Sequence, residues 1–306
     1  MDTKRQSLHI HRILRRFVLI GLLAMAGMPG TMAQSVDVFC GVDFNFKDLN
    51  FKRQYDLLIN LTPGFKWDMG NHWQLAGQVY VPVVNHYGEE FGYVRPNILV
   101  LSKQMQLGGL FVKASAGKFS HDRYGLDLKA FLPLASWFAL EAQAGYVGLL
   151  YTWPDWYIGK PDRFSGTVGG DIYLSRWNCQ LRGVAGWYLY QQFGCMAEAM
   201  RHFNHTTVSV YGSWHPTWNH KEEFDAGFRV VVMIPPYHRK HRTVNFRPAS
   251  NFRLSYTVMY QPYYNTMYKT DPEENERDGW FDRDLLEWGS HSMAPDFIIE
   301  GKEAEE

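Results

Sequence analysis

The chain has 306 residues, enough for one large domain or two small ones, and its 31 basic and 31 acidic residues cancel to a formal net charge of zero. Its three cysteines, Cys40, Cys179 and Cys195, are too few for a disulfide framework at this length, although any two of them could pair in an oxidising compartment. These features exclude a small disulfide-stabilised domain.

The zero net charge hides three unlike parts of the chain. Residues 1–33 contain five basic residues and one acid, and residues 271–306 contain thirteen acids and three basic residues. The part between them, residues 34–270, therefore carries a net charge of about +6. A basic body suggests an anionic partner, and a solvated acidic end that only aids solubility accounts for the split equally well.

The first 33 residues have the organisation of a secretory signal peptide. Basic residues precede a short apolar run, residues 17–30, and the small or permissive residues Thr31 and Ala33 follow it. The run is too short to cross a bilayer as a helix. We therefore expect cleavage after Ala33 and export of the remaining chain.

Between residues 36 and 261, apolar and polar residues alternate in segments of about ten residues that are separated by Gly, Pro, Asn, Asp and His. In residues 123–130, for example, Leu126 and Leu128 share one face, whereas Asp127 and Lys129 share the other. The same alternation occurs in residues 72–81, 138–146, 167–176, 206–214, 224–234 and 251–261. Because successive side chains of a strand point to opposite sides, each segment predicts a strand with one apolar and one polar face.

Two architectures fit this alternation. A soluble β-sandwich turns its apolar faces inward to a core, and a membrane β-barrel turns them outward to lipid. Three observations favour the barrel. Segments of about ten residues are long enough to cross a bilayer at a tilt. Aromatic residues make up 16% of the chain and gather near segment ends, at residues 153–157 and 260–268, and a signal peptide precedes a chain without a membrane helix.

We therefore predict an all-β chain that forms an antiparallel transmembrane β-barrel of roughly 12–14 strands after a cleaved signal peptide. The expected divisions are a signal peptide at residues 1–33, the barrel at residues 34–270 and an acidic, mobile tail at residues 271–306. The tail lacks the alternation, and residues 282–288 could form one short helix within it.

The polar faces of the predicted strands carry charged residues that would point into the barrel. They are Arg123, Asp127, Lys129, Glu141, Asp171, Arg182, Arg229 and Arg253. Two interpretations fit them: a polar, somewhat basic path or docking surface for an acidic glycan, and a set of mutually paired charges that holds the barrel closed. Farther along, Glu198 and Arg201 would face opposite sides of a strand and would pair on a short helix.

The densest basic group follows two consecutive prolines, which end the preceding strand and predict a loop. It consists of His238, Arg239, Lys240, His241 and Arg242. Such a loop could bind an anionic sugar or a lipopolysaccharide phosphate, or it could be an ordinary solvated loop. The two histidines have no third ligand at a suitable spacing, so we expect neither a metal nor a cofactor.

The sequence gives little indication of catalysis. Ser120, His121 and Asp122 are adjacent, and neighbouring residues of a strand point apart, so they are not expected to form a triad on their own. His291 and Ser292 form the other such grouping, and no phosphate-binding glycine loop, zinc spacing or dinucleotide fingerprint occurs. We expect that the protein is not an enzyme.

Several stretches together resemble the YjbH-like family of outer-membrane barrels linked to exopolysaccharide and capsule export. They are GKFSHDRYGLDLKA (residues 117–130), WFALEAQAGYVG (137–148), AGFRVVVMIPP (226–236) and TVNFRPASNFRLSY (243–256), and the similarity extends over about residues 55–260. The resemblance implies a barrel beside a polysaccharide secretion apparatus, without known catalysis.

The expected function is passive assistance to exopolysaccharide or capsule export in the bacterial outer membrane. The expected partners are outer-membrane lipid, an anionic polysaccharide and polysaccharide-secretion proteins, and no nucleic acid. Two alternatives remain open: a general porin or solute channel, and a structural interaction barrel without transport.

Overall fold

The computed structural model describes residues 35–47, 56–86, 88–152, 156–189, 193–203, 206–216, 222–232, 243–247, 252–258 and 268–272. The chain divides into two units after Gln34, and all of these residues belong to the second unit. The expected signal peptide, the basic loop at residues 238–242 and residues 273–306 of the expected tail lie outside the described residues.

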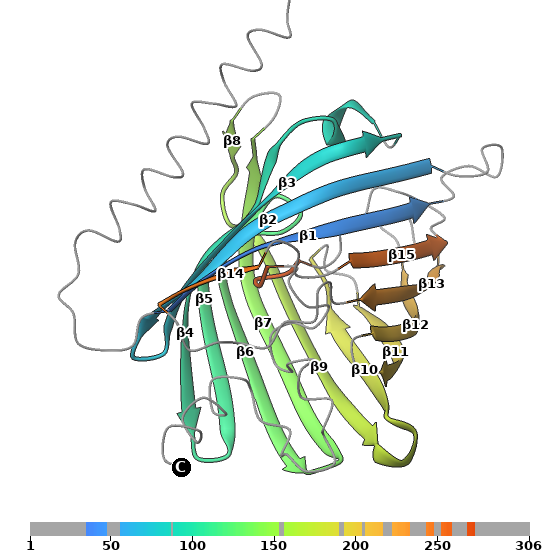
Figure 1. The fold of residues 1–306 in the computed structure, drawn as a ribbon. Coiled ribbons are helices and arrows are strands. Elements are labelled where there is room, and N and C mark those ends of the chain that lie inside the picture. Colours follow the sequence, from blue (N-terminus) through green and yellow to red (C-terminus); the bar gives the residue numbers. More distant parts are fainter. Residues whose placement is uncertain are drawn as a thin grey trace, which may run out of the picture. The chain divides into compact units, whose positions relative to one another are not determined.

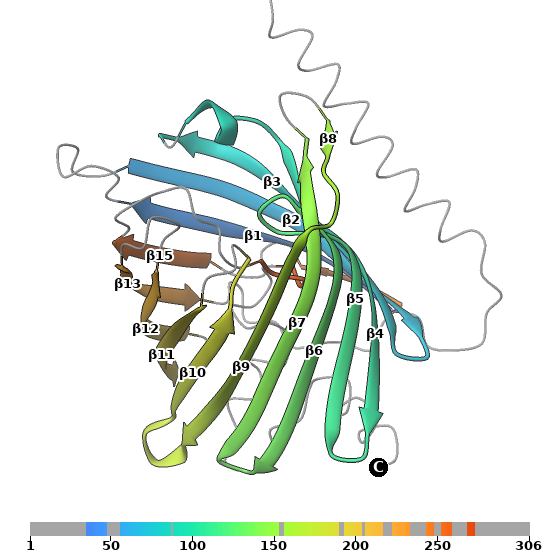
Figure 2. The same ribbon diagram turned by 180° about the vertical axis from the view of Figure 1, so that it is seen from behind.

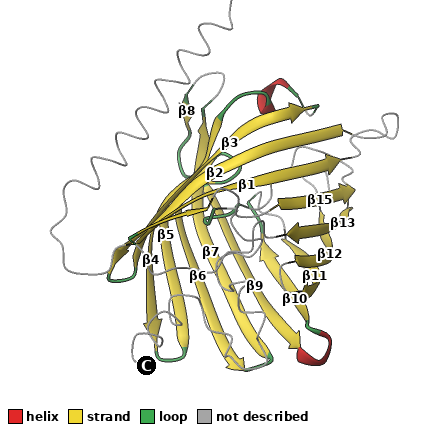
Figure 3. Cartoon of the chain, in the orientation of Figure 1, coloured by secondary structure: helices red, strands yellow, loops and turns green. Residues whose placement is uncertain are grey.

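The described residues are almost entirely strands (Figure 3). The strands are β1 (Ser35–Lys47), β2 (Asp56–Gly70), β3 (Trp73–Asn85), β4 (Arg95–Leu107), β5 (Leu110–Phe119), β6 (Arg123–Ala135), β7 (Phe138–Tyr151), β8 (Tyr157–Ile158), β9 (Arg163–Leu174), β10 (Cys179–Trp187), β11 (Phe193–Phe203), β12 (Thr206–Pro216), β13 (Glu222–Val232), β14 (Val244–Arg247) and β15 (Phe252–Val258). Two short 3-10 helices, Glu89–Phe91 and Ser175–Trp177, interrupt them, and in the described part of the chain no helix has the length and apolar character needed to cross a membrane.

The strands form one sheet in which neighbours in sequence are neighbours in space. From β1 to β7 and from β9 to β13 each strand pairs with the next in antiparallel orientation, β7 pairs with β9, and the two-residue β8 pairs with the end of β7. Figure 2 shows β4 to β7 and β9 side by side from behind. Such a meander connects long strands by short turns and needs no crossover.

The sheet closes on itself at β1. One edge of β1 pairs with β2, and the other pairs with β14 and then with β15, which lie beside it in Figure 1. Because β15 also pairs with β13, the ring runs through β1–β7, β9–β13 and the position shared by β14 and β15, thirteen strand positions among the described residues. An odd number of up-and-down strands makes the first and last strands parallel, and β1 pairs with both β14 and β15 in parallel.

Tight turns join several of the strands. Asn71 and His72, between β2 and β3, have φ values of 52° and 60°, and His121 and Asp122, before β6, have values of 55° and 54°. Two consecutive residues in the left-handed region give the turn a twist that matches the twist of the flanking strands. Asn, Asp and His are the non-glycine residues that enter this region most readily, which explains their presence in these turns.

The apolar faces of the strands point outward and the polar faces point inward. On β6 the side chains of Leu126 and Leu128 are 63% and 47% exposed, whereas Asp127 and Lys129 are 4% and 3% exposed. In a sandwich the exposures would be reversed, because its apolar faces form the core. The predicted transmembrane β-barrel is therefore confirmed, and the space inside the closed sheet is called the lumen below.

A small apolar cluster also lies inside the barrel. Its members are Ile98, Val100, Phe119, Val147, Leu189 and Tyr268. Tyr268 comes from residues 268–272, which are not part of any strand and are here named the internal segment. The lumen is therefore partly filled by the chain itself.

Candidate functional site

The lumen contains the charged residues that the alternation predicted to point inward. Arg123, Asp127, Lys129, Glu141 and Asp171 are each no more than 9% exposed. Arg182 and Arg229 are half-buried and reach toward acids of other strands. For Arg253 the structure describes the backbone on β15, opposite Asp43 of β1, but not the side chain.

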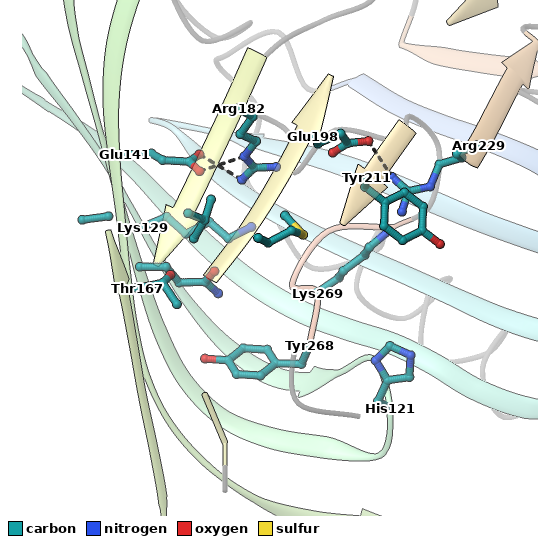
Figure 4. Close-up of a pocket in the computed structure, with 14 residues that line it drawn as sticks. His121, Lys129, Glu141, Thr167, Arg182, Glu198, Tyr211, Arg229, Tyr268 and Lys269 are labelled. Carbon is teal, nitrogen blue, oxygen red and sulfur yellow. Dashed lines mark hydrogen bonds and ion pairs between the residues drawn. The ribbon is translucent and has the colours of Figure 1, made fainter. Parts of the chain in front are cut away.

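Glu141 and Arg182 form a two-point ion pair across an intervening strand. The Arg182 Nε and Nη2 atoms donate to the two carboxylate oxygens of Glu141 at 2.8 and 2.9 Å (Figure 4). Glu141 lies opposite Gly169 of β9, and a Cβ atom on Gly169 would come within 2.9 Å of a Glu141 carboxylate oxygen. The glycine therefore leaves room for the Glu141 carboxylate beside β9, the strand that separates β7 from β10.

A second ion pair joins β11 and β13 across β12. Arg229 of β13 donates to a carboxylate oxygen of Glu198 of β11 at 3.3 Å, and its guanidinium carbon lies 5.1 Å from the centre of the Tyr211 ring. Glu198 and Arg201 face opposite sides of a strand: Glu198 is buried in the lumen, and Arg201 is exposed beside Phe203. The short-helix alternative for these residues is thereby excluded.

A buried polar network connects β9, β10, β11 and β12 inside the barrel. Gln180 donates to Asp171, and the two imidazole nitrogens of His202 lie 3.1 Å from Thr207 Oγ1 and 3.3 Å from Gln180 Oε1. Buried polar groups cost free energy unless they are paired. These contacts pair polar side chains with one another where water is excluded from the lumen.

The internal segment is anchored to the barrel wall through Tyr268 and Lys269. The Tyr268 hydroxyl donates to Asp127 at 2.6 Å, and its ring stacks on Phe119 with 5.2 Å between centres. The Lys269 backbone N–H donates to Ser120 Oγ at 2.7 Å and its carbonyl accepts from the Ser120 N–H at 3.0 Å. Gly145 provides space for the tyrosine, since a Cβ atom there would overlap its hydroxyl oxygen.

Asp271 completes the attachment of the internal segment. Its two carboxylate oxygens accept from Lys113 Nζ and, at 3.3 Å, from Lys129 Nζ. All three side chains are at least nine-tenths buried. Asp271 was expected to begin a mobile tail outside the barrel, and it lies inside with its charge neutralised, so the expected boundary at residues 270 and 271 cuts through the internal segment.

A cavity of about 180 Å³ lies beside the two ion pairs and the internal segment (Figure 4). Its polar lining comes from His121, Lys129, Glu141, Gln143, Thr167, Arg182, Glu198, Tyr211, Arg229, Tyr268 and Lys269. Ammonium, guanidinium, amide, hydroxyl and carboxylate groups meet there beside the Tyr211 ring. Such a lining can form hydrogen bonds with a hydroxylated or anionic ligand.

The Ser120, His121 and Asp122 group lies in a turn, so the expectation that these residues belong to a strand is wrong. Ser120 Oγ and His121 Nδ1 are 3.2 Å apart, but Asp122 accepts from Lys118 at 3.4 Å. Ser120 is buried and its hydroxyl accepts from the internal segment, which gives it a structural role. In the described part of the chain no three His, Cys, Asp or Glu side chains are placed to share a metal ion, and Cys40, Cys179 and Cys195 are free thiols.

Sequence reasoning missed Lys113 and Asp271 as lumen residues, and it placed Tyr268 among the aromatic residues at the membrane interface. Tyr268 is 7% exposed inside the barrel, so that interpretation was wrong, whereas Trp156 and Tyr157 of the other aromatic group are exposed. The alternation of β5 places Lys113 on the polar face, so that residue could have been found. Nothing in the local sequence of the internal segment signals its docking.

Comparisons with known proteins add one observation. A scan against protein-family models finds no match, and a search of curated proteins finds none either. Among solved structures, the chain is similar to a loop L8 deletion mutant of OmpT, described as an outer membrane protein of Vibrio cholerae. The identity is 9%, the TM-score is 0.38, and the match covers 66% of this chain and 90% of that one.

Proposed function

We propose that the chain is an outer-membrane β-barrel that assists the export or surface organisation of an exopolysaccharide or capsule. The lumen would act passively, as a polar path or docking surface for the glycan. The observation that carries this proposal is the cavity beside the Glu141–Arg182 and Glu198–Arg229 pairs, whose lining offers hydrogen-bond partners for sugar hydroxyls. The resemblance of residues 117–130 and 243–256 to YjbH-like proteins supports an exported polysaccharide as the ligand.

The proposal is tested in cells that lack the protein and are complemented with variants. Replacing Arg182 and Arg229 together by Met removes the guanidinium groups from the cavity, and we expect surface glycan to fall to the level of uncomplemented cells. Arg201→Met is the matched control, because Arg201 is exposed and lies on the opposite face of β11 from the lumen. Fractionation and a heat-modifiable gel mobility establish that each variant is a folded outer-membrane barrel.

The alternatives predict different results. A general solute channel conducts ions in planar bilayers, and its loss leaves surface glycan unchanged. A structural interaction barrel neither conducts nor changes the glycan, and it co-purifies with a protein partner. If cells without the protein carry as much surface glycan as cells with it, the export proposal is contradicted, whichever of the two alternatives holds.

A further inference from the structure

Two buried lysines face each other inside the barrel. Lys113 of β5 and Lys129 of β6 are directly opposite in the register of the two strands, and their exposures are 6% and 3%. Like charges directly opposite each other destabilise a sheet, and a buried ammonium group is costly without an anion. The two strands therefore create a position that requires a negative charge.

The negative charge is supplied from outside the sheet. Asp271 accepts from one lysine through each of its carboxylate oxygens, and Thr270 Oγ1 donates to the oxygen that faces Lys129, at 3.2 Å. The anion belongs to the internal segment, which is attached to the wall through two further residues, Tyr268 and Lys269.

We infer that Lys113 and Lys129 form a carboxylate-binding site of the lumen, and that Asp271 occupies this site as an internal competitor of a carboxylate-bearing sugar. The choice of a sugar rests on the proposed function; the site itself rests on the two lysines. In the bound state the sugar carboxylate would take the place of the Asp271 carboxylate, and the internal segment would leave the site.

The surroundings of the site suit this ligand. Two ammonium groups, each on one oxygen, match a planar carboxylate. Lys129 also lines the cavity, where Gln143, Thr167 and Tyr211 offer an amide, a hydroxyl and an aromatic ring. At about 180 Å³ the cavity is smaller than the roughly 300–1,000 Å³ of sites for drug-sized ligands, so it suits a single sugar residue.

Competition by Asp271 lowers the apparent affinity for the external ligand. A ligand that binds only when the site is vacant has its affinity reduced by the fraction of molecules in that state. Removing the Asp271 carboxylate should raise this fraction and therefore the apparent affinity, whereas also removing a lysine should cancel that gain.

The first test is calorimetric titration of the purified full-length protein in detergent micelles with a trimer of galacturonic acid. Asp271→Asn keeps the size of the side chain and removes its charge, and we expect it to bind the trimer at least tenfold more tightly than the unsubstituted protein. Asp162→Asn, which removes an acid with a 63% exposed side chain, should leave the affinity unchanged. A trimer of galactose, which lacks the carboxylates, should not bind measurably.

The lysines are tested on the background of the first variant. In Asp271→Asn/Lys129→Met the gain in affinity should disappear. An Asp271→Asn variant that is folded but binds no more tightly than the unsubstituted protein overturns the proposal. A gain that persists without Lys129 also overturns it, because the trimer then binds elsewhere.

A second measurement keeps Asp271 in place and so does not depend on the stability of that variant. Lys269→Cys, with Cys40, Cys179 and Cys195 replaced by Ser, places one thiol in the internal segment. The galacturonic acid trimer should raise the labelling rate of this thiol several-fold, and the galactose trimer should not. A labelling rate unaffected by the acidic trimer overturns the proposal. These measurements use purified protein, so their failure is separate from the outcome of the glycan assay in cells.

Discussion

At the scale of single residues, Glu141 and Arg182 form a two-point contact inside the polar lumen. Their side chains are 9% and 20% exposed, and each carboxylate oxygen accepts from a separate guanidinium nitrogen. Because Glu141 is buried, water has little access to the contact and cannot fully take over its hydrogen bonds to the guanidinium. The pair therefore differs in kind from ion pairs on the solvated surface.

Glu141→Gln should destabilise the barrel by about 3 kcal/mol, because it leaves a largely buried guanidinium with a weaker, neutral acceptor. Asp162→Asn is the control, since Asp162 pairs with Arg163 at 3.4 Å with side chains 63% and 31% exposed, and such pairs contribute at most about 1 kcal/mol. Urea unfolding in lipid vesicles measures both. Equal effects of the two substitutions would contradict a special role for the buried pair.

Gly145 gives a second prediction at this scale. In Gly145→Ala the new Cβ atom overlaps the Tyr268 hydroxyl, so we expect a loss of about 1–3 kcal/mol, typical of overpacking. Gly183→Ala is the control, since no heavy atom lies within 4 Å of its Cβ position. In Gly145→Ala/Tyr268→Phe the loss should be smaller than the sum of the two single losses, and simple additivity would show that the two residues do not interact.

At the scale of secondary-structure elements, each strand presents an apolar side to its surroundings. Leu128 lies near the middle of β6, opposite Ala114 on one side and Ala144 on the other. Leu107 is also exposed, but it is the last residue of β4, next to the turn at Gly108. The two leucines therefore differ chiefly in their depth along the strands.

Leu128→Arg should destabilise the barrel in lipid vesicles by about 2–4 kcal/mol, because a charge near the bilayer midplane is poorly solvated. Leu107→Arg, placed near the interface, should cost about 0–1 kcal/mol. The comparison is made by urea unfolding in vesicles. If both substitutions were tolerated equally, the outward faces would contact water and not lipid.

The elements were largely predictable from the sequence, and their contacts were not. A period of two residues assigns Asp127 and Leu128 to opposite faces, but it does not say which face points outward. The alternation also identified Glu141 and Arg182 as inward residues, yet they are 41 positions apart and meet across β9, where Gly169 leaves room for the Glu141 carboxylate. The internal segment could not be predicted, because its attachment depends on Ser120, Asp127 and Lys113, which are more than a hundred positions away.

At the scale of the whole barrel, the closure between β1 and β15 is the least local contact. Val42 pairs with Phe252 and Phe44 with Leu254, so residues about 210 positions apart must meet. Contacts of such high sequence separation form late, because the entropy of closing a long loop is lost before the strands gain their hydrogen bonds. The parallel orientation also distinguishes this seam from every other neighbouring pair of long strands.

Phe44→Cys/Leu254→Cys, with the three native cysteines replaced by Ser, should form a disulfide on mild oxidation of the membrane fraction. The two residues are opposite each other in the parallel register of β1 and β15. Phe44→Cys/Val258→Cys is the control, because a shift of four residues separates the positions by about 13 Å. A cross-link in the control, without one in the first pair, would indicate a different closure of the sheet.

The parallel closure also fixes the sidedness of the polypeptide. Because β1 and β15 run in the same direction, the chain enters β1 at one rim of the barrel and leaves β15 at the opposite rim. In a barrel with an even number of strands, both points lie at the same rim. A biotin acceptor peptide inserted before Ser35 and another inserted after Val258 would therefore be biotinylated from opposite sides of the membrane. The polypeptide thus begins its path across the bilayer on one side and completes it on the other.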